Sequence, residues 1–214
     1  MNILFFDCET TGKPISYSAS YTDVNNWPRV TQLAFCLCDD AGNVIAQFQS
    51  LIKPDGWVVP KEQFFIDNNM STERCEAEGI PIREALEQLM AAKLQADVLS
   101  AHNLNFDHRI VWAEFVRAEM PPRSGMHKIC TMMQSTRHCN LPGKRGPKWP
   151  TLGELHNVLF KKDFDGAHDA LADVLALKDC FFELLNLGVI SLPAPVDNPP
   201  APAPITEPEK LDFK

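Results

Sequence analysis

The sequence contains no run of about eighteen apolar residues, and its first residues have neither the basic flank nor the small-residue cleavage site of a secretory signal. We therefore expect neither a membrane span nor secretion. Basic residues are outnumbered, 20 against 28 acidic ones, and the resulting net charge of −8 disfavours a protein that coats DNA non-specifically. The seven cysteines are odd in number and form no paired zinc-binding pattern, which favours reduced thiols and a cytoplasmic location.

Proline is concentrated near the end of the sequence, where seven of the seventeen prolines fall within the last 24 residues. Residues 191–214 are therefore predicted to form a flexible tail with polyproline II character. The remaining residues, 1–190, are predicted to form one domain. With 45% hydrophobic residues in the chain, this domain can bury a core without a disulfide or a structural metal. The sequence shows no internal repeat.

Apolar segments of strand length alternate with amphipathic segments in the predicted domain. Strands are predicted for residues 3–6, 30–37, 44–52 and 97–101. Helices are predicted for residues 81–95, 106–119, 151–159 and 169–187. The first three strands follow one another and the fourth comes after a helix. This order predicts an α/β fold whose mixed sheet has three antiparallel strands, then parallel ones, and is flanked by helices. Residues 13–28 are interpreted as a loop insertion.

Four acidic residues lie where predicted strands end or helices begin. Asp7 and Glu9 follow the first strand, Asp107 opens one helix and Asp173 lies in the last helix. Asp7 and Glu9 are two residues apart, so an extended backbone projects both carboxylates to the same side. Clustered carboxylates raise one another's pKa values unless a cation lies between them. Oxygen ligands of this kind select Mg²⁺ or Mn²⁺.

Two such ions about 3.5–4 Å apart are a known device for in-line attack at phosphorus. Taken singly, each of these acidic residues is more simply explained as a structural or solvated side chain. An Asp-x-Glu at a strand end is common, and an Asp in a helix is usually exposed to solvent. The joint occurrence of the four carboxylates is what indicates a catalytic site.

Three motifs resemble those of the DnaQ-like proofreading exonucleases. They are Phe6-Asp7-Cys8-Glu9-Thr10-Thr11-Gly12, Ala101-His102-Asn103-Leu104-Asn105-Phe106-Asp107 and His168-Asp169-Ala170-Leu171-Ala172-Asp173. Their order and spacing are similar to those of the DEDDh branch, and the resemblance extends over residues 1–187. It implies a ribonuclease H-like fold and two-metal 3′→5′ exonuclease activity. It also implies that Asp7, Glu9, Asp107 and Asp173 are metal ligands and that His168 is the general base.

His168 and Asp173 are five residues apart, which on a regular helix separates their side chains by about 140°. We therefore expect His168 to precede the helix and to enter the site from a loop. Asp169 competes as a ligand because it lies four residues before Asp173 on the same helical face. Its alternative role is an acidic residue that complements the dipole at the helix N-terminus.

The turn Thr10, Thr11 and Gly12 offers backbone N–H groups and hydroxyls to a terminal nucleotide, although an ordinary turn explains it equally well. His102 and Asn103 are further candidate substrate contacts, and His102 is also interpreted as a hydrogen-bonding residue at a strand end. The sequence departs from the resemblance at residues 65–71, where relatives commonly carry a His-Gly pair before the Ser or Thr.

The expected function is a metal-dependent exonuclease that releases nucleoside 5′-monophosphates from single-stranded or frayed DNA 3′ ends, in proofreading or repair. An exoribonuclease that trims RNA 3′ ends is a sister hypothesis, because discrimination of the 2′-hydroxyl depends on pocket contacts. The basic, aromatic loop 144–149 suits phosphate contacts and base stacking, or is simply a soluble loop. A hypothesis from a different functional class is a non-catalytic subunit that recruits a sliding clamp or a polymerase through its tail, which ends in Leu211-Asp212-Phe213-Lys214.

Overall fold

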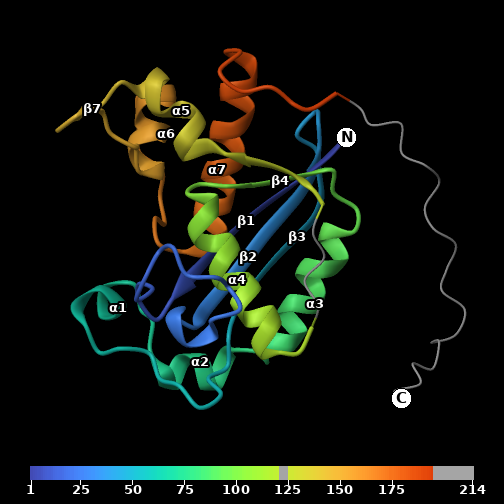
Figure 1. Ribbon diagram of the computed structural model, residues 1–214, viewed down its shortest axis with the longest axis vertical. Coiled ribbons are helices and arrows are strands. Elements are labelled where there is room, and N and C mark those ends of the chain that lie inside the picture. Colours follow the sequence, from blue (N-terminus) through green and yellow to red (C-terminus); the bar gives the residue numbers. More distant parts are fainter. Residues whose placement is uncertain (121–124, 195–214) are drawn as a thin grey trace, which may run out of the picture.

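The structure is a computed structural model, and it describes residues 1–120 and 125–194. Its centre is a mixed sheet with the strand order β3-β2-β1-β4-β5 (Figure 1). These strands are β1 (Asn2–Thr10), β2 (Val30–Asp39), β3 (Val44–Leu51), β4 (Val98–Ala101) and β5 (His127–Cys130). β1, β2 and β3 pair antiparallel, whereas β4 pairs parallel with β1 and β5 pairs parallel with β4. The predicted mixed sheet is thus confirmed.

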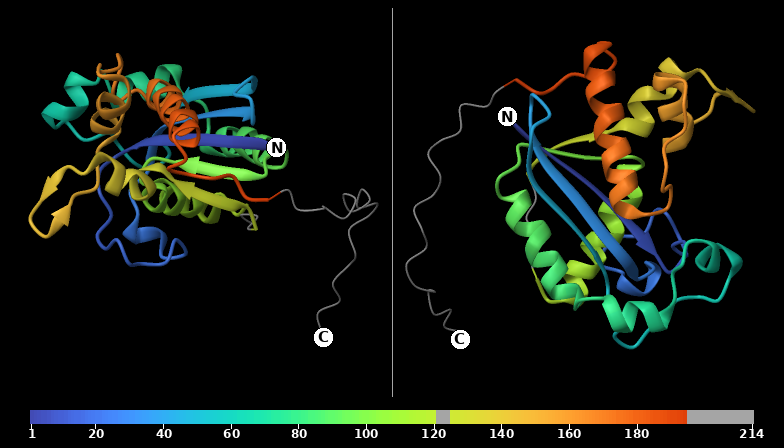
Figure 2. Two further views of the ribbon diagram at one scale, coloured as in Figure 1. Left: turned by 90° about the horizontal axis from the view of Figure 1, so that it is seen from above. Right: turned by 180° about the vertical axis from the view of Figure 1, so that it is seen from behind.

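Helices cover both faces of the sheet (Figure 2). They are α1 (Gln63–Asp67), α2 (Thr72–Glu78), α3 (Ile82–Lys93), α4 (Leu104–Arg117), α5 (Thr131–Cys139), α6 (Leu152–Phe160) and α7 (Ala170–Asn186). Alternate residues of β1 divide the core into two layers. Leu4 and Phe6 pack with residues of α3 and α4, whereas Ile3 and Phe5 pack with residues of α7. The four predicted helices correspond to α3, α4, α6 and α7.

The first strand is longer than the sequence predicted, since β1 continues to Thr10. Its apolar run stops at Phe6, but the pairing with β2 does not, because Asp7 faces Ala34 and Glu9 faces Gln32 across the ladder. Asp7 and Glu9 therefore lie within the strand and not beyond it. The regular backbone holds both side chains on the face that β1 presents to α7.

Residues 13–28 form the predicted loop, which contains one short 3₁₀ turn, η1 (Val24–Asn26). Two arginines of α4 fasten this loop to the domain. Arg117 donates to the carbonyl oxygens of Val24 and Trp27, and Arg109 donates to that of Ala19. The insertion is thereby ordered against α4.

Several elements were not predicted from the sequence, among them β5, α5 and the small hairpin of β6 (Pro142–Gly143) and β7 (Gly146–Pro147). In β5 Ile129 is buried, whereas His127 and Lys128 are exposed, so this edge strand lacks an apolar run. The hairpin carries the basic loop 144–149, and Figure 2 shows it projecting from the rest of the domain.

The described chain continues past α7, and Ile190 is buried in the layer of core under that helix. The predicted boundary after residue 190 falls just beyond this contact. Most of the predicted tail, including its last four residues, lies outside the described residues. Within the described residues, no helix combines the length and apolar character that a membrane crossing needs.

Candidate active site

Asp107 approaches the carboxylates of β1 from the opposite face of the sheet. It lies in the first turn of α4, directly after β4, and its side chain is buried. The chain enters α4 through Asn103, whose backbone is left-handed with φ 65°. The Cys8 thiol, which lies between Asp7 and Glu9 in the strand, donates a hydrogen bond of 3.4 Å to Asp107 Oδ1. This bond ties α4 to β1 at the level of the acidic residues.

α7 supplies the remaining carboxylate and begins beside the sheet. Asp169 is its N-cap and accepts hydrogen bonds from the backbone N–H groups of Leu171 and Ala172. Gln32 and Gln49 donate to the other oxygen of Asp169. Both oxygens of Asp169 are thus used inside the protein, in agreement with its role at the helix N-terminus. Asp173 stands one turn later.

His168 precedes α7, as the spacing argument predicted, and its backbone is left-handed with φ 71°. Its backbone N–H donates to Asp173 Oδ2 at 3.3 Å. The imidazole is exposed, and its ring meets that of Phe64 edge-on with 5.1 Å between the ring centres. The left-handed backbone at His168 allows the side chains of His168 and Asp173 to lie close together although they are five residues apart.

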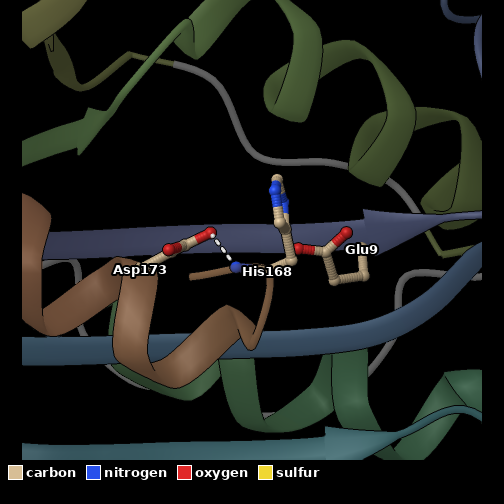
Figure 3. A group of neighbouring side chains, drawn as sticks. All are labelled: Glu9, His168 and Asp173. Atoms are coloured by element: carbon tan, nitrogen blue, oxygen red, sulfur yellow. Dashed lines mark hydrogen bonds between the residues drawn. The ribbon is translucent and has the colours of Figure 1, made fainter. Parts of the chain in front are cut away.

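Glu9, His168 and Asp173 form one group at the end of β1, with His168 between the two carboxylates (Figure 3). One ligand atom from each residue lies within 4.8 Å of those of the others. Asp7 and Asp107 are not members of this close group in the described part of the chain. The charge of Asp107 raises the pKa of Glu9, and the charges of Glu9 and Asp173 raise the pKa of Asp7.

Burial is the main cause of raised pKa values among the four carboxylates, and their mutual repulsion adds to it. The pKa of Glu9 is raised to about 8, first by burial and then by the charges of Asp173 and Asp107. Burial likewise raises the pKa of Asp107 to about 7 and that of Asp173 to about 6. Asp7 is affected by burial and by the other three carboxylates, and its pKa lies well above the usual range.

Such a set of buried and half-buried acids is costly to ionise unless a cation balances it. The oxygens of Glu9 and Asp173, joined by an imidazole nitrogen of His168, match the donor types that divalent cations accept. The residues present therefore fit a divalent metal ion. The structure also places His168 close enough to these carboxylates to bind the same ion. The sequence analysis gave His168 only the role of general base.

The predicted substrate turn follows β1 directly. The Thr10 hydroxyl donates to the Gly12 carbonyl at 2.8 Å, and the Thr11 hydroxyl accepts from the Arg29 N–H at 3.0 Å. The Thr11 hydroxyl keeps its own hydrogen for another acceptor. Gly12 has φ 147°, and a Cβ placed there would meet no atom within 4 Å, so the backbone is open to a ligand.

His102 uses both ring nitrogens inside the protein. Nε2 lies 3.0 Å from the Pro150 carbonyl, which can only accept, so Nε2 carries the hydrogen and Nδ1 accepts from the Thr131 hydroxyl. Burial lowers the pKa of His102 to about 4, which keeps the ring neutral. Its contacts are those of a structural hydrogen-bonding residue. Through Pro150, His102 holds the base of the basic hairpin beside α4.

Comparison with known proteins decides the family. Residues 4–181 match the model of the RNase_T family, described as exonuclease. The chain belongs to the RNase_T exonuclease family. The predicted membership of an exonuclease family is therefore confirmed, and dependence on a divalent metal ion follows from membership. No curated protein matches the sequence.

Solved structures of E. coli exonuclease I share the fold of this exonuclease domain. Its complex with a dA16 oligonucleotide has a TM-score of 0.63 and 20% sequence identity, covering 86% of this chain and 41% of that one. The zinc-bound form of its complex with single-stranded DNA has a TM-score of 0.66 and 20% identity, covering 86% and 40%. The chain thus spans about two-fifths of the length of those proteins.

Two residues that shape the candidate active site were not predicted from the sequence. Phe64 in α1 places its ring against His168, and Gln32 in β2 binds the start of α7. Phe64 lies in a short helix without an apolar stripe, so no periodic pattern marks it. Gln32 left a detectable signal, because it is a polar residue within an otherwise apolar strand and is 4% exposed.

Proposed function

We propose that this exonuclease domain removes nucleoside 5′-monophosphates from the 3′ ends of single-stranded or frayed DNA, in a reaction that depends on Mg²⁺ or Mn²⁺. The observation that carries the proposal is the close group of Glu9, His168 and Asp173, with Asp7 and Asp107 beside it. The structures of E. coli exonuclease I with single-stranded DNA support DNA as the substrate class.

In the proposed reaction Asp7, Glu9, Asp107 and Asp173 hold two divalent ions, which supply Lewis acidity and charge neutralisation at the scissile phosphate. The imidazole of His168 takes the proton from the attacking water, because its exposed ring reaches the group while its backbone is held by Asp173. As the water oxygen bonds to phosphorus, the bond from phosphorus to the 3′ oxygen of the preceding nucleotide breaks.

Further residues position the reacting groups in this proposal. Cys8 fixes Asp107 through its thiol, and Asp169 fixes the start of α7. Thr11 and the open backbone at Gly12 receive the terminal nucleotide. Asn103 is the N-cap of α4, in the turn that delivers Asp107.

The test uses the purified protein and end-labelled DNA and RNA oligonucleotides of the same sequence, with Mg²⁺ and with Mn²⁺. Stepwise shortening of the DNA from its 3′ end, with release of nucleoside 5′-monophosphates, is the expected result. Faster shortening of RNA would instead assign the exoribonuclease function. If neither strand is shortened with either ion, the enzymatic proposal is wrong and a non-catalytic role remains.

A further inference from the structure

A basic cavity opens beside the end of β1, on the face of the sheet opposite to α7. It has a volume of about 410 Å³ and lies between the loop before α3, the start of α3 and the end of α4. Its charged lining residues are Arg29, Lys53, Asp55, Arg83 and Arg117. Four cations thus gather in one hollow of a chain whose net charge is −8.

Carboxylates neutralise only part of this charge. Glu114 is 1% exposed and accepts from Arg29 Nε at 2.8 Å and from Arg117 Nη1 at 2.9 Å, so one carboxylate serves two guanidinium groups. Asp55 is exposed and meets Arg29 through its backbone oxygen. Counting both carboxylates against the four cations leaves a formal charge of +2 in and beneath the cavity. A hollow with this excess attracts anions.

Two cations of the cavity remain available to a ligand. Within the described part of the chain, the exposed Lys53 ammonium has neither an ion pair nor a hydrogen bond to a side chain. Arg83 is also exposed and uses one nitrogen on the Ala118 carbonyl, leaving its other donors free. Arg83 also lies in the first turn of α3, whose N-cap, Pro81, provides no side-chain capping bond. The dipole of the helix adds to the attraction for an anion at this end.

The cavity is joined directly to the proposed substrate turn. Thr11 donates from its backbone N–H to the Arg29 carbonyl at 2.9 Å, and the Arg29 N–H donates back to the Thr11 hydroxyl at 3.0 Å. Arg29 thus links the turn where the terminal nucleotide is proposed to bind with the cationic hollow. The cavity and the proposed substrate turn thus share one residue.

We propose that this cavity binds a phosphodiester group of the nucleic acid strand, on the 5′ side of the terminal nucleotide. Lys53 and Arg83 contact the phosphate, and Arg29 and Arg117 form the positively charged floor held by Glu114. The proposal rests on the proposed function, since the strand enters through the turn of Thr11. A cavity phosphate lies away from the scissile bond, so it contributes to strand affinity and not to the chemical step.

The double variant Lys53→Gln/Arg83→Gln tests the proposal while leaving the Glu114 ion pairs intact. Its control is Lys161→Gln/Lys162→Gln, which removes the same charge from two exposed lysines just after α6. Lys162 lies with Ala41 and Glu183 at the opposite end of the sheet. Melting temperatures are measured first, and both variants are expected to match the unaltered protein.

Strand affinity is measured with a fluorescent oligothymidylate of about 12 nucleotides in the presence of chelator, which prevents hydrolysis, over a range of salt concentrations. The cavity variant is expected to bind roughly tenfold more weakly at low salt, and its slope of log affinity against log salt to fall by about 1. The control variant retains the slope. An unchanged slope in the cavity variant overturns the proposal, whether or not the protein has nuclease activity.

Two further probes separate the cavity from the chemical site. Thymidine 5′-phosphate p-nitrophenyl ester has no phosphate beyond the scissile one, so the cavity variant is expected to hydrolyse it as the unaltered protein does, while the KM for the oligonucleotide rises. Equal losses on both substrates would place Lys53 and Arg83 in the chemical site and overturn the proposal. Inorganic phosphate or thymidine monophosphate binding that is lost in the variant, with unchanged oligonucleotide binding, would assign a free-anion site instead. If the unaltered protein hydrolyses neither substrate, the proposed function fails, and the salt slope still decides the phosphate site.

Discussion

Gln32 holds Asp169 across the junction between β2 and α7. The Gln32 amide nitrogen donates to Asp169 Oδ2 at 3.0 Å, and its oxygen accepts from the Ala170 N–H at 3.0 Å. Because Gln32 also faces Glu9 in the β1–β2 ladder, one buried side chain sets the start of α7 relative to the acidic residues of β1. This contact therefore also helps to fix the positions of His168 and Asp173, which flank Asp169 and Ala170.

Gln32→Leu is therefore expected to lower kcat on DNA by roughly 10- to 100-fold, since small misplacements of catalytic groups carry penalties of this size. It also leaves the buried Ala170 N–H without an acceptor, at a cost of about 1–3 kcal/mol in the free energy of unfolding. Steady-state kinetics and denaturant unfolding measure the two effects. Gln49→Leu is the matched control, because Gln49 is exposed and binds Asp169 but not Ala170. Equal effects of the two variants would contradict a special role for Gln32.

His168→Ala is expected to lower kcat by roughly 10²–10⁴-fold, the usual contribution of a general base. The affinity for Mn²⁺, measured by calorimetry, distinguishes the two roles considered for His168, general base and metal ligand. Loss of a general base leaves the metal affinity largely unchanged, whereas loss of a metal ligand weakens it. His138→Ala is the control, since His138 is exposed at the end of α5. Turnover close to that of the unaltered protein would move the role of base to another group.

Asp7→Asn is expected to lower activity more than His168→Ala does, because Asp7 is proposed to be one of the metal ligands. The same change removes one charge from a buried, mutually repelling set, so the metal-free variant is expected to melt at a higher temperature. Activity assays and thermal melts in chelator test the pair of effects. A lower melting temperature would show that Asp7 stabilises the metal-free fold.

The metal-free protein is expected to lose stability as pH rises from about 4 to about 8. In the folded state the pKa values of Glu9, Asp107 and Asp173 are about 8, 7 and 6, above the values of about 4 that carboxyl groups have when unfolded. Between these limits the folded state binds more protons than the unfolded state, so the free energy of unfolding falls with pH.

Thermal melts in chelator between pH 5 and pH 8.5 measure this dependence. Because the ions replace the protons, added Mg²⁺ or Mn²⁺ is expected to raise the melting temperature more at pH 8 than at pH 5. A melting temperature of the metal-free protein that stays constant or rises over this range would contradict the electrostatic description of the site.

The sequence by itself determined the layered architecture and the identity of the acidic residues. The period of apolar residues in 81–95 and 169–187 is set by which faces are buried, and that pattern is visible without coordinates. β5 and α1 escaped prediction because a short edge strand and a short helix expose most of their residues. The end of β1 was placed too early because pairing with a neighbouring strand, and not apolar character, extends it.

Only the tertiary structure decided how the acidic residues are arranged. It placed His168 between Glu9 and Asp173, gave Asp169 to the helix cap, and joined Arg29 to Lys53 and Arg83 in one basic cavity. These relationships join segments that are far apart in the chain, and they depend on side-chain hydrogen bonds across the sheet. Local patterns record which residues are buried, but the distance between two distant side chains exists only once the sheet has brought them together.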